Sequence, residues 1–341
     1  MIDLRSDTVT RPTPPMRKAM ARAEVGDDVF GEDPSVNQLQ NKVATLIGKE
    51  AGLFVASGTM ANQVSIKSHT DPGDEIIIEA GSHIFHYESG APSFLSGVQL
   101  NPIIGKLGVV TSEQIEPVIR PKNMHHAPTR LIWIENTHNR AGGTVFPIEE
   151  IHNIRKLADK HALSMHLDGA RLWNAHVATG IPLNEYARDF NSVSVCFSKG
   201  LGAPVGSMIL GSGEFVRKAR RIRKIFGGGM RQAGIIAAGA LYAVEHHISR
   251  MKQDHEHARL LAENLFNLPG VSVNLDSVQT NIVYFDVSKT GKTGKAIEQQ
   301  LFENGVQMIA VGPARLRAVT HLDVTREHIQ QVIAVLEKIF I

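Results

Sequence analysis

The sequence has a single cysteine, Cys196, in a chain of 341 residues, so no internal disulfide can form. Structural disulfides are typical of secreted proteins, so this shortage favours a reducing compartment, and we expect the protein in the cytoplasm. The segment Met1 to Asp7 has no apolar run of the kind that a secretory signal requires. The best long apolar run, Ile235 to Val244, is too short to span a bilayer. It predicts a buried helix and no membrane partner.

A strong charge of one sign is missing as well. Lys and Arg number 36 against 34 Asp and Glu, a net charge of +2 that argues against a dedicated nucleic-acid binder. The basic run Arg217 to Lys224 predicts a solvated helix or a weak anion-binding patch. No metal site is predicted, because Arg259 stands where a zinc-binding helix starting at His255 requires a second histidine. With 43% hydrophobic and 21% charged residues, the composition is typical of globular proteins.

Short apolar segments alternate with helical ones through most of the chain. The alternation is typical of an α/β domain with a mostly parallel sheet. The predicted strands are 51–56, 74–79, 130–135, 162–167 and 192–197, with a hairpin return at 207–210, and the helices between them include 60–68 and 148–161.

The pattern changes near residue 248. A charged helix over 251–266 is followed by extended segments 271–273 and 281–287, a helix over 295–304, a strand-like segment 314–321 and an amphipathic helix over 327–340. We therefore predict two domains. The first is a large domain of residues 1–247 that includes the N-terminal arm, and the second is a small C-terminal α+β domain of residues 248–341.

Chemically versatile residues follow three of the predicted strands. Asp168 ends one strand, Lys199 follows the next, and Ser57-Gly58-Thr59 leads from a strand into a helix. Ligands of open α/β sheets bind at the carboxyl ends of the strands. A helix N-terminus binds phosphate, a lysine forms a Schiff base with an aldehyde, and an aspartate pairs with a protonated pyridine nitrogen. Together the three groups predict a site for pyridoxal 5′-phosphate.

Each of these features alone has an ordinary explanation. Ser57-Gly58-Thr59 is typical of a helix N-cap, and an aspartate such as Asp168 at a strand end is typical of a turn. Ser198-Lys199-Gly200 is typical of a solvated loop. Their order along an alternating chain is what favours the joint interpretation.

Longer motifs carry a resemblance to a known family. The chain resembles the L-threonine aldolases, pyridoxal-phosphate enzymes of the aspartate-aminotransferase fold type, nearly from end to end. This resemblance implies fold type I, with a mostly parallel seven-stranded sheet flanked by helices and a small C-terminal α+β domain. The motifs that carry it are 3–10 (DLRSDTVT), 26–34 (GDDVFGEDP), 57–60 (SGTM), 82–84 (SHI), 135–139 (ENTHN), 168–171 (DGAR), 198–201 (SKGL) and 227–232 (GGGMRQ).

The resemblance also implies roles toward the cofactor. Lys199 resembles the Schiff-base lysine, Asp168 the partner of the pyridine nitrogen, and Ser57 to Thr59 the phosphate cradle. His83 resembles the histidine that stacks on the cofactor ring, and it is a candidate catalytic base. Further cofactor-site candidates are Arg171, Lys224 and Arg231, of which Lys224 and Arg231 are expected to reach the site of a neighbouring subunit.

Other positions resemble the substrate-binding residues of the family. Arg171 and Arg317 match the pair that clamps the substrate carboxylate, which suits the planar fork of the guanidinium group. Ser6 matches an arm residue that helps to hold the same carboxylate. His125 matches a histidine near the substrate hydroxyl, although the adjacent His126 could take its place.

The reaction that the resemblance implies is retro-aldol cleavage of L-threonine, L-allo-threonine and other L-3-hydroxy-α-amino acids to glycine and an aldehyde. The base could be His83, His125 or a bound water. Other open possibilities are β-elimination or transamination with the same cofactor, a non-catalytic carrier of pyridoxal phosphate, and an anion- or nucleic-acid-binding module that uses Arg217 to Lys224. The resemblance further implies a homo-oligomer, a dimer of dimers with shared active sites.

Overall fold

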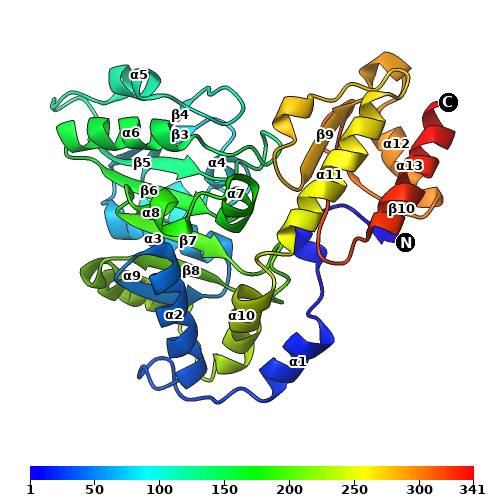
Figure 1. Cartoon of the computed structure of the whole chain (residues 1–341). Helices are drawn as coiled ribbons and strands as arrows, with labels where there is room; N and C mark the ends of the chain where they lie inside the picture. Colours follow the sequence, from blue (N-terminus) through cyan, green and yellow to red (C-terminus); the bar gives the residue numbers. More distant parts are fainter.

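A seven-stranded sheet organises the larger part of the chain (Figure 1). The computed structural model describes residues 1–341. The strands lie in the order β2-β8-β7-β6-β5-β3-β4, and only β8 runs antiparallel to its neighbours. This confirms the predicted fold class. The strands are β2 (Ala51–Val55), β3 (Glu75–Glu79), β4 (Gln99–Ile103), β5 (Thr129–Glu135), β6 (Ser164–Gly169), β7 (Ser192–Cys196) and β8 (Ser207–Gly211).

Helices cover this sheet, and the central strands are buried along their whole length, as expected for a parallel sheet with two covered faces. Asp33 caps α2 by accepting a hydrogen bond from the Val36 amide, and Gly48 ends that helix in the left-handed conformation. The helices of this part are α1 (Pro14–Ala21), α2 (Pro34–Ile47), α3 (Gly58–His69), α4 (His83–His86), α5 (Ser112–Ile115), α6 (Ile148–Lys160), α7 (Leu172–Thr179), α8 (Leu183–Ala187), α9 (Gly213–Ile225) and α10 (Gly234–His246).

The C-terminal part has its own apolar core and a three-stranded antiparallel sheet in the order β11-β12-β9. The segment 271–273, predicted to be extended, makes only an isolated bridge between Ser272 and Asp286. The elements are α11 (Met251–Phe266), β9 (Ile282–Asp286), α12 (Gly294–Glu303), β10 (Val306–Gln307), β11 (Ile309–Ala310), β12 (Arg315–Val319) and α13 (Arg326–Phe340).

The N-terminal arm joins the two parts of the molecule. Strand β1 (Ile2–Asp3) pairs in parallel with β10, and Leu4 lies fully buried in the C-terminal core. In Figure 1 the arm, in blue, runs from beside α13 toward α1. The arm is therefore packed against the C-terminal part at its start, whereas the predicted division counts it with the large domain. The boundary at residue 247 stays a prediction; the nearest helices end at His246 and begin at Met251.

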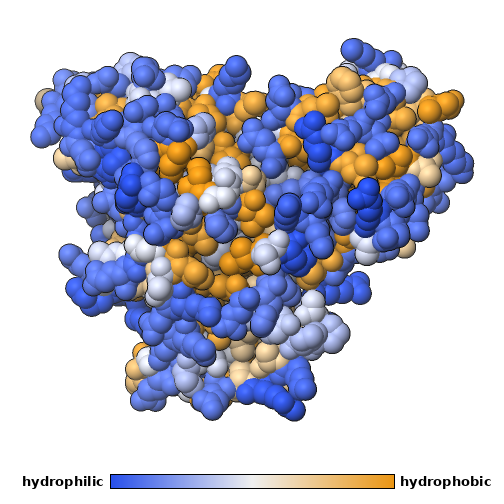
Figure 2. All heavy atoms as spheres, in the orientation of Figure 1, coloured by the Kyte–Doolittle hydropathy of each residue, from blue (hydrophilic) through white to orange (hydrophobic).

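The surface combines hydrophilic borders with an apolar middle. Figure 2 shows a band of apolar atoms down the middle of one face, surrounded by hydrophilic atoms. Several large apolar side chains are exposed, among them Phe30, Phe94, Met124 and Ile225. None of the helices combines the length and the apolar character that crossing a membrane would require.

Candidate active site

A cavity of about 210 Å³ opens at the carboxyl ends of the central strands. It collects residues from loops after β2, β3, β5, β6 and β7, together with the N-terminal arm. Seven predicted site residues lie in its wall, so the structure brings them together in one chain. The lining residues are Thr8, Ser57, Gly58, Thr59, Asn62, His83, Glu135, Asn139, Asp168, Ala170, Arg171, Cys196, Ser198 and Lys199.

Asp168 is a buried carboxylate at the end of β6, with 2% of its surface exposed. It accepts hydrogen bonds from Asn62 Nδ2 (2.9 Å) and from the Ala170 amide (3.1 Å). Burial, followed by the neighbouring charge of Glu135, raises the pKa of Asp168 from 3.8 to about 6. No basic side chain forms a hydrogen bond with it. A buried carboxylate of this kind gains most from a cationic partner such as a protonated pyridine nitrogen, so Asp168 fits its predicted role.

The N-terminus of α3 meets the same cavity. Ser57 caps the helix by accepting a hydrogen bond from the Met60 amide (3.1 Å). The helix then begins with Gly58 and Thr59, whose amides point out of the first turn as in any helix. A Cβ atom on Gly58 would lie 2.9 Å from Cys196 Sγ, so only glycine fits at this position without a shift. The first turn therefore fits a phosphate group while also being an ordinary N-cap.

Lys199 lies in the loop after β7, on the side of the cavity that adjoins the arm. Its side chain is half-buried, and its carbonyl accepts a hydrogen bond from Thr10 Oγ1 (3.2 Å). Lys199 and Asp168 both line the cavity, and the charge of Lys199 lowers the pKa of Asp168 against the opposing effect of burial. An amine and a buried carboxylate across a small cavity fit the aldehyde and the ring nitrogen of pyridoxal phosphate.

His83, at the start of α4, is held by two carboxylates. Its Nδ1 lies 2.8 Å from Glu88 Oε1, and its backbone amide donates to Glu135 Oε2 (2.7 Å). Burial alone would lower the pKa of His83, but the hydrogen bond to Glu88 and the charges of Asp168 and Glu135 raise it above its usual value. Glu135 belongs to the motif 135–139, whereas Glu88 lies outside the quoted motifs and also bonds Asn62 and Gln63, which are 26 and 25 residues away along the chain.

The two predicted clamp arginines meet at one acceptor. Nη1 of Arg171 and Nη1 of Arg317 each lie 3.4 Å from Asn139 Oδ1. One side of the Arg171 guanidinium group is occupied, because Nε and Nη2 both donate to the buried Asp7 carboxylate at 2.7 Å. This ion pair takes two of the five N–H groups of Arg171, so a carboxylate clamp would use the remaining N–H groups on Nη1 and Nη2. The predicted role of Arg171 toward a substrate stays a prediction. Arg317 donates through Nη2 to the Arg5 carbonyl (3.0 Å), which ties it to the arm.

Ser6 lies next to the cavity and does not line it. Its Oγ accepts hydrogen bonds from the amide of Thr8 (3.2 Å) and from the Thr8 hydroxyl (2.8 Å), and Thr8 itself reaches the wall. Ser6 therefore caps the short turn that carries Thr8 and Asp7.

Besides Ser6 and Arg317, three predicted residues do not line the cavity of their own chain. His125 is exposed in the loop before β5, at the amino end of that strand, and His126 lies beside it. Since the cavity is at the carboxyl end, neither histidine can touch its contents within one chain. Lys224 and Arg231 are exposed as well, and Arg231 forms an ion pair with Asp27 (2.9 Å). A role for these residues in a site requires a second copy of the chain.

Three of the six basic side chains in the run Arg217 to Lys224 are engaged inside the chain. Lys218 donates to the Ser68 carbonyl (2.7 Å), and Arg220 donates to the Asp28 carbonyl (3.0 Å). Arg223 is 2% exposed and pairs with the Asp28 carboxylate (2.6 Å). Arg217, Arg221 and Lys224 stay exposed, so the contacts reduce the basic patch by half.

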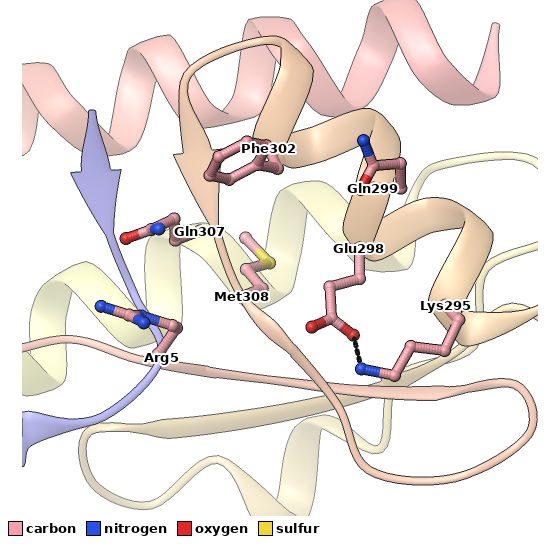
Figure 3. Close-up of a pocket in the computed structure, with 7 residues that line it drawn as sticks. All are labelled: Arg5, Lys295, Glu298, Gln299, Phe302, Gln307 and Met308. Carbon is pink, nitrogen blue, oxygen red and sulfur yellow. Dashed lines mark hydrogen bonds and ion pairs between the residues drawn. The ribbon is translucent and has the colours of Figure 1, made fainter.

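Several cavities elsewhere are larger than the one at the strand ends. One of about 330 Å³ lies in the C-terminal part beside the arm (Figure 3). Its most prominent charges, Lys295 and Glu298, neutralise each other in an ion pair of 2.7 Å. None of the predicted site residues lies in its wall, which consists of Arg5, Lys295, Glu298, Gln299, Phe302, Gln307 and Met308. The smaller cavity at the strand ends is therefore the candidate active site.

A buried aspartate, a lysine and a helix N-terminus at the carboxyl ends of a mostly parallel sheet define a pyridoxal-phosphate enzyme of fold type I. Residues 3–288 match the family described as beta-eliminating lyase. Low-specificity L-threonine aldolase 1 of Arabidopsis thaliana is 44% identical over 329 residues, 95% of this chain and 92% of that protein. The low specificity L-threonine aldolase of Escherichia coli strain K12 is 40% identical over 335 residues, 98% of each chain.

The chain belongs to the family of low-specificity L-threonine aldolases and is an enzyme, as predicted. Enzymes of this family depend on pyridoxal 5′-phosphate, which confirms the predicted cofactor. A solved structure of a Leishmania major threonine aldolase covers the whole of both chains with a TM-score of 0.87 at 19% identity, and this similarity concerns the fold.

Proposed function

We propose that the chain cleaves L-threonine, L-allo-threonine and related L-3-hydroxy-α-amino acids into glycine and an aldehyde. The observation that carries the proposal is the cavity in which Asp168, Lys199 and the first turn of α3 converge. Membership of the threonine aldolase family supports the reaction class.

Three groups would hold the cofactor. Lys199 would bind its aldehyde carbon through Nζ, the first turn of α3 its phosphate, and Asp168 its ring nitrogen. When bound, pyridoxal phosphate supplies an electron sink that accepts the electron pair of the broken Cα–Cβ bond. Asp168 strengthens this sink by keeping a positive charge at the ring nitrogen, which needs the carboxylate in its ionised form.

The substrate carboxylate would lie between Arg317 and Nη1 of Arg171. Both groups already converge on Asn139 Oδ1, and an oxygen at that point accepts from both guanidinium groups. A carboxylate held in this way cannot rotate, and the fixed orientation favours breaking the bond to the hydroxyl-bearing carbon. Asp7 fixes the Arg171 guanidinium before the substrate arrives.

His83 is the candidate base for the β-hydroxyl proton. It lines the cavity, and Nδ1 is engaged by Glu88, which leaves Nε2 as its second proton-binding atom. A general base at this point would contribute about 10²–10⁴-fold. His125 is a further candidate only if it enters from a second subunit, since it lies at the opposite end of β5.

We further propose a homo-oligomer in which Lys224, Arg231 and His125 contribute to a neighbouring active site. All three side chains are exposed, and the large apolar side chains on the surface, such as Phe94, favour contact with another copy. The cytoplasmic location likewise stays a prediction from the single cysteine.

The test of the reaction is acetaldehyde release from L-threonine by the purified protein with pyridoxal phosphate. The Lys199→Ala variant and the control Lys289→Ala, at an exposed position far along the chain, are assayed in parallel. We expect equimolar glycine and acetaldehyde from the wild type and the control, and nearly none from Lys199→Ala. Formation of 2-oxobutanoate and ammonia instead would identify β-elimination, and no product with bound cofactor would indicate a carrier.

A further inference from the structure

A fully buried carboxylate lies directly behind the candidate base. The Glu88 side chain has no exposed surface, although Glu88 belongs to a short loop after α4. It accepts three hydrogen bonds: from His83 Nδ1 (2.8 Å) and Asn62 Nδ2 (2.8 Å) at Oε1, and from Gln63 Nε2 (2.6 Å) at Oε2. A buried carboxylate needs such compensation, because burial of an unpaired charge is strongly unfavourable.

The hydrogen-bond donors around Glu88 determine which ring nitrogen of His83 carries the hydrogen. Both amides present N–H groups, so both oxygens of the Glu88 carboxylate act as acceptors. Nδ1 of His83 must then carry the hydrogen in the bond to Glu88. In the neutral ring, the lone pair is consequently on Nε2. The ring remains one-third exposed and lines the cavity.

We propose that Glu88 is a positioning residue for the retro-aldol reaction, an inference that rests on the proposed function. Its carboxylate holds His83 in the Nδ1–H tautomer, presents the Nε2 lone pair to the substrate hydroxyl, and stabilises the imidazolium that forms when the proton moves. The proton travels from the β-hydroxyl to Nε2 while the Cα–Cβ bond breaks, and its electron pair goes to the bound cofactor. Glu88 itself gains no proton.

Asn62 extends this arrangement to the cofactor side. The same Nδ2 group that contacts Glu88 donates to Asp168 Oδ2 (2.9 Å), while Asn62 Oδ1 accepts from Ser194 Oγ (3.1 Å). The serine thus fixes which way the amide points. One amide therefore holds the carboxylate behind the base and the carboxylate for the ring nitrogen at a fixed separation.

Other charges also face His83 and enter any pH dependence. Glu135 contacts its backbone amide, and Asp168 and Lys199 line the same cavity. None of these three groups forms a hydrogen bond with the imidazole ring of His83, whereas Glu88 does. Replacing Glu88 therefore separates its effect on the His83 ring from the effects of Glu135, Asp168 and Lys199.

The test compares Glu88→Gln, His83→Phe and the double variant, all loaded with pyridoxal phosphate. Glutamine keeps the size and an oxygen for His83, and Gln63 can turn its amide to match, since its Oε1 has no partner in the wild type. Glu303→Gln, an exposed position on α12, is the matched control. The readouts are kcat and KM for L-threonine and the ¹⁵N NMR titration of ring-labelled His83.

If Glu88 acts through His83, Glu88→Gln lowers kcat about 10-fold or more with KM changed less than about threefold. The pKa of His83 falls, because the ring loses its anionic partner, and the Nδ1–H tautomer is the major neutral form in the wild type. In the His83→Phe background, Glu88→Gln has no additional effect on kcat. Glu303→Gln behaves as the wild type.

An equal loss of kcat from Glu88→Gln with and without His83 would overturn the proposal, because it would show a structural effect. An Nε2–H tautomer in the wild type would overturn it as well. Acetaldehyde release by the wild type tests the proposed function separately, and the NMR signature of His83 tests the action of Glu88 on the ring whatever the substrate is.

Discussion

Replacing Asp168 with asparagine should stabilise the cofactor-free protein and disable the enzyme. The wild-type carboxylate is buried, and its pKa in the folded protein is raised from 3.8 to about 6 by burial and by Glu135. A carboxyl group whose pKa is raised by folding destabilises the folded protein when it is ionised. This destabilisation is absent below pH 4, grows as the pH rises toward 6 and stays constant at higher pH.

The magnitude follows from the pKa shift. A shift from 3.8 to about 6, at about 1.4 kcal/mol for each unit, makes ionised Asp168 unfavourable by about 3 kcal/mol above pH 7. Asparagine keeps the size but loses one of the two acceptors used by Asn62 and the Ala170 amide, which costs about 1 kcal/mol. We therefore expect a net gain of about 2 kcal/mol at pH 8 that shrinks toward zero near pH 5.

The assay is urea unfolding of cofactor-free wild type and Asp168→Asn at pH 8 and pH 5, followed by circular dichroism. The same variant, tested with pyridoxal phosphate, should bind the cofactor more weakly and lose at least about 100-fold in kcat, because the ring nitrogen has no anionic partner. A variant that is less stable than the wild type by the same amount at both pH values would refute the assignment of a desolvated, ionisable Asp168.

Arg317→Lys should raise KM for L-threonine about 10-fold or more with a smaller change in kcat, because an ammonium group cannot replace the guanidinium fork; steady-state kinetics with unchanged KM would contradict this. Gly58→Ala should weaken binding of pyridoxal phosphate, since its Cβ would lie 2.9 Å from Cys196 Sγ, and adding Cys196→Ala should restore much of the affinity in a fluorescence titration. Asp7→Asn should destabilise the protein by about 3–5 kcal/mol in urea unfolding at pH 7, because it leaves the buried Arg171 without its anion. Arg171 holds the pKa of Asp7 well below its usual value, so the difference between wild type and Asp7→Asn should shrink as the pH falls below 4.

The sequence predicts much of the fold because strands and helices here follow local patterns. The predicted helix over 251–266 coincides with α11, and the helix expected over 60–68 is α3, which begins two residues earlier at Gly58. The edge strand β4 went unpredicted: it is half-exposed and contains Pro102, so it lacks the apolar run of a central strand. The parallel pairing of β1 with β10 joins opposite ends of the chain and leaves no local signal.

The site was predictable where residues follow strands and unpredictable where side chains meet across the chain. The placement of Asp168 and Lys199 beside one cavity could be predicted from their position after apolar segments. The pairing of Asp7 with Arg171 joins positions 164 residues apart, and it changes how the arginine is used. The placement of His125 at the amino end of β5 depends on the direction of the strand that follows it, which motif matching does not consider.

Asp7 and Asp168 show how the partner of a buried carboxylate decides its function. Both are almost completely buried near the same cavity, yet their pKa values move in opposite directions. Asp7 receives two hydrogen bonds from the charged Arg171, so its negative charge is compensated within the chain. Asp168 receives only neutral N–H donors, so its charge is stabilised less than that of Asp7. Asp7 therefore fastens the arm to the site, and Asp168 is the carboxylate that a cationic ring nitrogen stabilises most.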